Sequence, residues 1–272
     1  MLKLAVIGAQ TLLGRELVQS LEPQECSVLP LATGPLSKNE EEGDLVVFAP
    51  DPALLEGLDV VILADAPGDP GLLEGFQGRI LDLRPEADSR LEPMPLAGAW
   101  PEGRKAYRGR PAMELVLALL PGLVEGLGTV AGTHLRSIAC LGDRGLEGLM
   151  EQTLAVLNGE EPPLEKLGFR AAFEVVPQPP RGSLIEVRVP AFHGDLLILH
   201  VRAKDGGTMA RKEAPAGVQW LEAPPSSRQV AVSSDLLAHL ALDGDGRTGV
   251  LTLGFDPILW GILRPMTRLL GL

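Results

Sequence analysis

The seven residues from Gly8 to Gly14 have the spacing of a phosphate-binding turn. Leu4–Ile7, before the turn, is apolar enough for a short buried parallel strand, and Arg15–Leu21, after it, fits the start of an amphipathic helix. The pattern predicts a βα unit in which backbone N–H groups and the positive end of the helix dipole meet a pyrophosphate. The chemistry that this spacing offers is the binding of a dinucleotide.

Thr11 weakens the prediction for the cofactor more than the prediction for the fold. It stands where a three-glycine turn has its second glycine, and a Cβ at that place would press on the bound phosphates. Lys38, near the end of the next predicted strand, either meets the 2′-phosphate of NADP or is a solvated loop lysine. We therefore expect NADP or NAD to bind weakly or not at all. The candidate contacts are Gly8, Gln10, Thr11, Leu12, Gly14 and Thr33.

The cysteines and histidines form no pattern typical of metal or disulfide chemistry. Cys26 and Cys140 are too few for a disulfide framework, and the four histidines have no metal-ligand spacing, so we expect no metal. Cys140 lies in the apolar run Leu135–Leu141, which we interpret as a strand. It is either a replacement nucleophile or an inert core residue.

Two further pairs of side chains have residue types that can act in acid/base chemistry or bind an anion. His193 and Asp195 would share a face if one strand contains both, either as an acid/base pair or as a surface histidine near a carboxylate. Arg110 and Arg188 carry guanidinium groups that suit a carboxylate or a phosphate.

The first half of the chain alternates strands and helices. This alternation predicts a Rossmann-like, doubly wound parallel sheet, hence an α/β fold. Arg84–Arg110, rich in proline, glycine and charge, is expected to be a long surface excursion, either functional or a solvated crossover. The expected strands are Ser27–Ala32, Asp44–Phe48, Leu58–Ala64 and Arg79–Leu83, with a short helix at Gly71–Gln77.

The second half changes to strands with polar alternation, which predicts a mainly antiparallel sheet in a second, α+β domain. The expected domains are residues 1–131 with 256–272, and residues 132–255. Helices are expected from Pro111, at Gly145–Leu157 and at Pro257–Leu270. The expected strands are Ala172–Val176, Leu184–Val189, Leu196–Arg202, Val218–Leu221, Val230–Ser233 and Val250–Phe255.

Composition narrows the classes of partner. The chain has 272 residues and a net charge of −12, which disfavours nucleic acid and anionic membrane surfaces. No apolar run approaches 18 residues, so we expect no membrane span. Met1 runs directly into the first predicted strand, which leaves no room for a signal peptide and predicts a cytoplasmic protein.

Several stretches together resemble the aspartate-semialdehyde dehydrogenase family, and more closely its Usg-type relatives. GAQTLLG at Gly8–Gly14 is similar to the family's GATGxVG, ILDL at Ile80–Leu83 to V-I-D-x-S, and VPAFHGD at Val189–Asp195 to V-P-V-x-x-G-H. Asp143–Gly159 followed by Phe169–Gln178 resembles the Usg-type helix, N-G turn and A-F-N-xx-P segment. The resemblance spans essentially the whole chain, which is shorter than family members by some tens of residues.

The resemblance implies a reaction in which a cysteine forms a thioester, a histidine acts as acid and base, and NADP carries the hydride. Aligning Glu114–Val116 on the family's Q-L-V places Arg110 on the cysteine, and Asp195 falls on the histidine. A guanidinium has no electron pair with which to attack, and an ordinary carboxyl group is a poor proton donor at neutral pH. Only His193 remains as a remnant acid/base candidate, and no catalytic residue is assigned.

Other family features are also missing. Pro177–Gly182 leaves room only for a turn where the family has its substrate-binding helix, and Pro257 replaces the asparagine of the family's D-N pair. We therefore expect a Usg-like homologue without dehydrogenase activity. The alternative is a NAD(P)-dependent oxidoreductase for an aldehyde or acyl phosphate of aspartate-family amino-acid biosynthesis, with relocated residues. Its small-molecule ligand is not identified by the sequence.

The resemblance also implies a two-fold homodimer built through the second domain. Leu184–Val189 and Leu196–Leu199 supply apolar residues to both faces of their strands. Helix Gly145–Leu157 is expected to cover one face of the sheet, which leaves the other face for a second copy of the chain.

Overall fold

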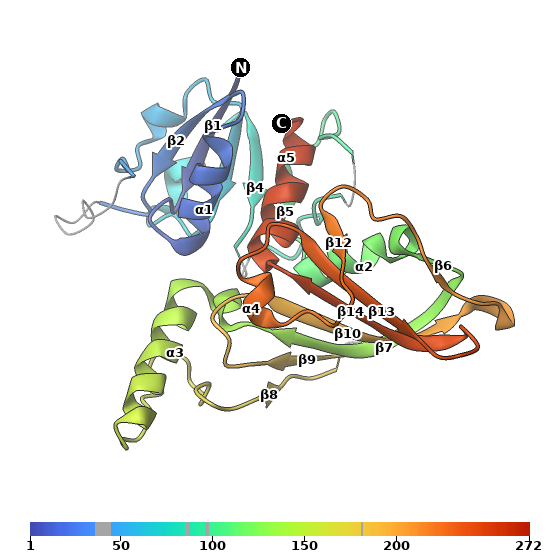
Figure 1. Cartoon of the computed structure of the whole chain (residues 1–272). Coiled ribbons are helices and arrows are strands. Elements are labelled where there is room, and N and C mark those ends of the chain that lie inside the picture. The colour runs from blue at the N-terminus through green and yellow to red at the C-terminus, as the bar shows by residue number, and fades with distance from the viewer. Residues whose placement is uncertain (36–44, 85–86, 96–97, 181) are drawn as a thin grey trace. The chain divides into compact units, whose positions relative to one another are not determined.

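The computed structural model describes residues 1–35, 45–84, 87–95, 98–180 and 182–272. The chain divides into two compact units, Met1–Pro111 with Ile262–Leu272, and Ala112–Gly261. The predicted limits at residues 131 and 256 differ from these, because helix α2 (Ala112–Leu123) packs on the sheet of the second unit. Figure 1 shows the main sheet of each unit. The predicted fold class, a parallel Rossmann-like sheet followed by a second α+β unit, is confirmed.

The first unit is built on a parallel sheet with the strand order β2-β1-β3-β4-β5. In this order the connections reverse between β1 and β3, and ligands of doubly wound folds bind at the carboxyl ends of the strands near such a reversal. The turn that follows β1 therefore lies at the expected place for a ligand. The strands are β1 (Leu2–Ile7), β2 (Cys26–Leu31), β3 (Val60–Leu63), β4 (Arg79–Asp82) and β5 (Ala106–Arg108).

Helix α1 (Leu12–Leu21) is amphipathic, and its buried residues include Leu17, Val18 and Leu21. The unit also contains the short 3₁₀ helices η1 (Pro52–Leu55) and η2 (Pro70–Leu73), and helix α5 (Arg264–Leu270). Its sheet core consists of buried aliphatic side chains from the central strands and from η1 and η2. These are Ala5, Ile7, Leu31, Leu55, Val61, Leu63 and Leu72.

Three predictions in this unit are corrected. The excursion Arg84–Arg110 contains strand β5, and Met94, Trp100 and Tyr107 within it are buried, so it is partly core. Of Asp44–Phe48, the described part makes one bridge, Leu31 to Phe48, and no strand, while Asp44 lies outside the described residues, as does Lys38. The helix predicted at Gly71–Gln77 is the single turn η2, because Pro70 and the capping Asp69 start it and Glu74 already has an extended backbone.

The second unit contains a seven-stranded mixed sheet with the order β12-β13-β14-β10-β7-β9-β8. The pairs β12–β13 and β7–β9 are parallel and the other pairs are antiparallel. The strands are β7 (Leu127–Arg136), β8 (Val176–Pro177), β9 (Leu184–Arg188), β10 (Asp195–Ala203), β12 (Val218–Trp220), β13 (Leu236–Leu242) and β14 (Thr248–Phe255). A separate small sheet pairs β6 (Val124–Glu125) with β11 (Ala210–Arg211).

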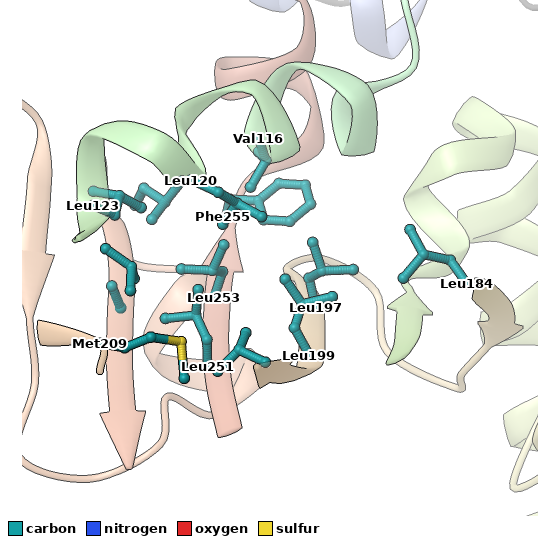
Figure 2. Packing of buried hydrophobic residues seen from close by; sticks show 14 of the residues in the cluster. Val116, Leu120, Leu123, Leu184, Leu197, Leu199, Met209, Leu251, Leu253 and Phe255 are labelled. Carbon is teal, nitrogen blue, oxygen red and sulfur yellow. The ribbon is translucent and has the colours of Figure 1, made fainter. Parts of the chain in front are cut away.

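Helix α2 covers one face of this sheet. Figure 2 shows Val116, Leu120 and Leu123 of α2 above side chains of the central strands. Those strand residues include Leu197 and Leu199 of β10 and Leu251, Leu253 and Phe255 of β14. The prediction that Gly145–Leu157 covers the sheet was therefore wrong. Helix α3 (Gly142–Leu157) instead packs its buried Leu149 with Ile138 and the segment that contains Ala171 and Ala172.

Three further strand predictions in this unit are corrected. Strand β7 ends at Arg136, and Ile138–Leu141 is a 3₁₀ turn, η3, so Cys140 is not in a strand. Val230–Ser233 is not a strand, because Ser226 caps the short helix α4 (Ser227–Val230). Of Ala172–Val176, only Val176 enters a strand. Strand β13 and most of β7 were not predicted.

The segment Pro177–Gly182, predicted to have room only for a turn, contains no helix among its described residues, and its correspondence to the family's substrate-binding helix stays a prediction. β8 and β9 pair antiparallel and are joined by residues 178–183, of which residue 181 is outside the described part. Six residues are too few for a helix of several turns. The predicted C-terminal helix is present, as a continuous helical segment with a π turn, η5 (Leu259–Leu263), before α5. No helix among the described residues is both long and apolar enough to cross a membrane.

Candidate functional sites

The turn between β1 and α1 keeps two of the three structural features of a dinucleotide turn. Gly8 has a φ of +87°, which favours glycine and allows the chain to leave the strand sharply. A Cβ on Gly14 would lie 2.0 Å from the carbonyl oxygen of Gly8, so only glycine permits the close approach of helix and strand. These are the roles of the first and third glycines of the turn.

Thr11 takes the place of the second glycine and bonds within the turn. It is the N-cap of α1, and its Oγ1 accepts a hydrogen bond from the N–H of Gly14 at 3.1 Å. The same hydroxyl donates to the carbonyl oxygen of Gly8 at 2.8 Å. Both the donor and an acceptor lone pair of this side chain are therefore engaged inside the protein.

Gln10 connects the turn to the end of the neighbouring strand. Its Nε2 donates to Oγ1 of Thr33, just after β2, at 2.9 Å, and its Oε1 is buried with no hydrogen-bond partner among the described atoms. Leu12 is the first residue of α1 and is half-buried. The structure thus brings together the six residues predicted to contact a cofactor, although their part in binding stays a prediction.

As they stand, these residues do not fit a dinucleotide. A phosphate oxygen bound at a helix N-terminus lies about 3 Å from the N–H groups that hold it. Thr11 Oγ1 already occupies that position at Gly14, and the Gln10 side chain spans from the turn to Thr33. We therefore derive no chemical step through NADP or NAD.

The second unit contains a buried polar cluster centred on Asp195. Asp195 is the first residue of β10 and is 1% exposed, and it faces His134 of β7 and Ser137, which follows β7. Its Oδ1 accepts hydrogen bonds from the Ser137 N–H at 2.9 Å and from the Ser137 hydroxyl at 2.8 Å. Its Oδ2 lies 2.9 Å from Nε2 of His134.

Side chains of β7, β9 and β14 complete the surroundings of His134. Its Nδ1 lies 3.9 Å from Oε2 of Glu186 and has no hydrogen-bond partner among the described atoms. Glu186 accepts a hydrogen bond from Nη1 of Arg136 at 3.1 Å, and the His134 ring stacks on Phe255 at 5.9 Å between centroids. Asp195 is therefore an internal acceptor, fixed by neighbours on two sides and closed off from solvent.

The predicted pair of His193 and Asp195 is not formed. His193 lies in a bend before β10, not in the strand, so the two residues do not follow the alternation of one strand. The carboxylate oxygens of Asp195 are engaged by His134 and Ser137 instead. Those two partners were not identified from the sequence, because only the pairing of β7 with β10 brings them to Asp195.

Cys140 lies close to this cluster but is poorly suited to be a nucleophile. Burial raises the pKa of its thiol, and the nearby guanidinium groups of Arg136 and Arg188 only partly oppose this effect. Because the thiolate is the attacking form, a raised pKa leaves little nucleophile at neutral pH.

The two arginines suggested as anion ligands differ in their surroundings. Arg110 is in the first unit, and its Nε donates to the carbonyl oxygen of Met94 at 2.9 Å. Arg188 places its guanidinium over the ring of Phe169 at 5.3 Å, and its Nε is buried without a hydrogen-bond partner among the described atoms. Arg188 is thus the better placed of the two to meet an anion. No group of three or more His, Cys, Asp or Glu side chains in the described ranges is arranged to hold a metal ion.

The two units together have the fold of aspartate-semialdehyde dehydrogenases of known structure. A probable aspartate-semialdehyde dehydrogenase from Pseudomonas aeruginosa is similar with a TM-score of 0.76 and 16% identity, over 98% of this chain and 97% of that chain. Aspartate semialdehyde dehydrogenase II from Vibrio cholerae, complexed with ASA, gives 0.71 and 16%, over 97% and 96%. The Francisella tularensis enzyme gives 0.70 and 14%, over 98% of each chain.

These similarities establish the fold, at a level of identity that carries no assignment of activity. No protein-family model matches the chain, and no curated protein matches it in sequence.

Proposed function

We propose that this chain is a Usg-type homologue of aspartate-semialdehyde dehydrogenase that lacks dehydrogenase activity. The observation that carries the proposal is the state of Asp195, at the position that the resemblance gives to the acid/base histidine. Its side chain is buried, is hydrogen-bonded to Nε2 of His134, and accepts hydrogen bonds from both donors of Ser137. A proton-transfer group must reach its substrate within hydrogen-bond distance, and a carboxylate enclosed in this way has no free direction for one.

Two other positions support the same proposal. Arg110 stands where the resemblance puts the nucleophilic cysteine, and a guanidinium forms no covalent intermediate. The connection of residues 178–183 between β8 and β9 replaces the helix that binds substrate in the family. These changes remove the nucleophile, the acid/base group and the substrate-binding helix from the same reaction.

The alternative, a NAD(P)-dependent oxidoreductase with relocated residues, is favoured by one observation. Cys140 and Arg188 are neighbours, and Nε of Arg188 is buried without a hydrogen-bond partner among the described atoms. In an acyl-transfer site, the thiol would be the nucleophile and the arginine would bind an anionic substrate group. The raised pKa of the thiol argues against it.

Steady-state turnover separates the two proposals. We expect no phosphate-dependent reduction of NADP or NAD with aspartate semialdehyde above the rate without protein. The double variant Arg110→Cys and Asp195→His should remain inactive, because the substrate helix is also missing. Turnover by the unmodified protein that disappears in Cys140→Ala would establish the alternative.

We also propose that the chain assembles with itself as a two-fold dimer through the second unit, in the cytoplasm. Ile185 of β9 is 46% exposed, and Leu196 and Ile198 of β10 point away from the face that α2 covers and are only half-buried. Helix α3 adds Met150, Leu154 and Leu157, which are spaced along one side of the helix and are 51%, 55% and 70% exposed. Exposed apolar side chains on β9, β10 and α3 are typical of an interface.

Light scattering at micromolar concentration tests the dimer. We expect twice the mass of one chain, and an interface of more than about 2,000 Å² in total. Ile198→Asp should shift the protein to monomer, since it places a charge in the interface. The matched control is Val232→Asp, because Val232 is an 86% exposed apolar residue outside the sheet. A monomer in the unmodified protein, or equal behaviour of the two variants, would contradict the proposal.

A further inference from the structure

We infer that Thr11 and Gln10 close the dinucleotide turn from within, so that the turn is a latent diphosphate site that a single substitution opens. The inference goes beyond the proposed function, because it concerns binding and holds whether or not the chain turns over a substrate. The three glycine positions of a dinucleotide-binding turn have different roles. The first and third are intact at Gly8 and Gly14, so the backbone still has the shape that a diphosphate needs.

The hydroxyl oxygen of Thr11 lies where an oxygen of a bound phosphate would lie. A bound phosphate would accept hydrogen bonds from N–H groups of the first turn of α1. In this chain the N–H of Gly14 donates to Thr11 Oγ1 at 3.1 Å. A phosphate oxygen at the same N–H would need the space that Oγ1 fills, so the hydroxyl and a phosphate exclude each other.

The Thr11 side chain is also held in this position from its other side. Its hydroxyl donates to the Gly8 carbonyl at 2.8 Å, and its own N–H donates to the same carbonyl at 2.9 Å. Rotation of the side chain away from the helix would break the hydrogen bonds to Gly8 and Gly14 together. These hydrogen bonds hold the Thr11 side chain in the turn. A threonine whose hydroxyl lacked them could rotate away and make room for a phosphate.

Gln10 forms a second barrier between the turn and the end of β2, where doubly wound folds hold the ribose of a dinucleotide. Its Nε2 donates to Thr33 Oγ1 at 2.9 Å, and its Oε1 is buried and unpaired among the described atoms. If the side-chain amide were flipped, its nitrogen would be the unpaired atom instead of its oxygen. In either orientation one polar atom of the Gln10 amide has no hydrogen-bond partner among the described atoms. Gln10 is therefore the weaker barrier, and Thr11 decides whether the site is open.

The decisive variant is Thr11→Gly, which removes both the hydroxyl and the Cβ. Glycine is itself a common N-cap residue, and Thr11 has extended backbone angles that glycine adopts readily, so α1 should persist. Thr11→Ser is the matched control, because it keeps the oxygen that accepts from Gly14. Calorimetry and thermal shift with NADP, NAD and inorganic pyrophosphate are then measured on full-length protein.

The unmodified chain and Thr11→Ser should show no binding tighter than about 1 mM. Thr11→Gly should bind all three probes at least tenfold more tightly, with a rise in Tm at millimolar ligand. Gln10→Ala added to Thr11→Gly should strengthen NADP and NAD binding further but leave pyrophosphate binding unchanged, because pyrophosphate has no ribose.

A folded Thr11→Gly protein that binds no more tightly than Thr11→Ser would overturn the inference. So would micromolar binding of NADP by the unmodified chain. If Thr11→Gly does not fold, Thr11→Ala decides the question, since it also removes the hydroxyl and must bind more tightly than Thr11→Ser. None of these results depends on the turnover assay, so the inference and the proposed function fail separately.

Discussion

Replacing Asp195 by alanine is expected to lower the free energy of unfolding by about 3–5 kcal/mol, because each buried donor left unpaired costs about 1–3 kcal/mol. The change leaves the Ser137 N–H and the Ser137 hydroxyl without their acceptor, and Nε2 of His134 without its hydrogen-bond partner. All three residues are at most 3% exposed, so water cannot replace the carboxylate without opening the sheet. The large loss would identify Asp195 as a residue that stabilises the fold.

Equilibrium urea unfolding measures this effect. Asp245→Ala is the matched control, because exposed Asp245 in the same unit accepts a single hydrogen bond, from the N–H of Arg247. It should cost no more than about 1 kcal/mol. Asp195→Asn should fall between the two, since the amide keeps one acceptor oxygen. Similar losses for Asp195→Ala and Asp245→Ala would show that the Asp195 hydrogen bonds do not stabilise the fold.

Replacing Gln152 by alanine is expected to cost about 3 kcal/mol, since it unpairs several buried backbone groups at once. The side chain of Gln152, fully buried on α3, bonds four backbone groups of the segment that follows the helix. Its Nε2 donates to the carbonyls of Pro163 and Phe169 at 2.8 and 2.9 Å, and its Oε1 accepts from the N–H groups of Ala171 and Ala172 at 2.7 and 3.2 Å.

Hydrogen exchange locates the expected damage. The amides of Ala171 and Ala172 should exchange faster by at least tenfold in Gln152→Ala, while amides of β10 keep their protection. Gln178→Ala is the control, because Gln178 donates only to the nearby carbonyls of Val176 and Pro177. Unchanged exchange at Ala171 in Gln152→Ala would refute the assigned role.

The elements that the sequence predicts well are those with strong local patterns. Strand β3 is a run of four buried aliphatic residues, and the turn from Gly8 to Gly14 is specified by its own glycines, so both are readable without knowledge of the rest of the chain. Residues Gly8, Gln10, Thr11, Gly14 and Thr33 meet in the structure because they adjoin β1 and β2, which are neighbours in the sheet.

The errors have identifiable causes. Ser226 and Gln229 have the spacing of a capping box, a helix signal that precedes Val230, yet the apolar run after it was interpreted as a strand. Ile138–Leu141 is apolar enough for a strand, but the hydrogen bonds from Ser137 to Asp195 end β7 before it. The polar cluster was not predictable, because His134 and Asp195 are 61 positions apart and meet only through the register of β7 and β10.

The most direct test of the proposed function is the search for a covalent intermediate. The reaction that the resemblance implies passes through an acyl thioester on a cysteine, which phosphate then cleaves. The protein is incubated with aspartate semialdehyde and NADP without phosphate, and its intact mass is measured. We predict an unchanged mass, since neither Cys140 nor Arg110 serves as the nucleophile. A stoichiometric acyl adduct that is absent in Cys140→Ala and released by phosphate would contradict the account.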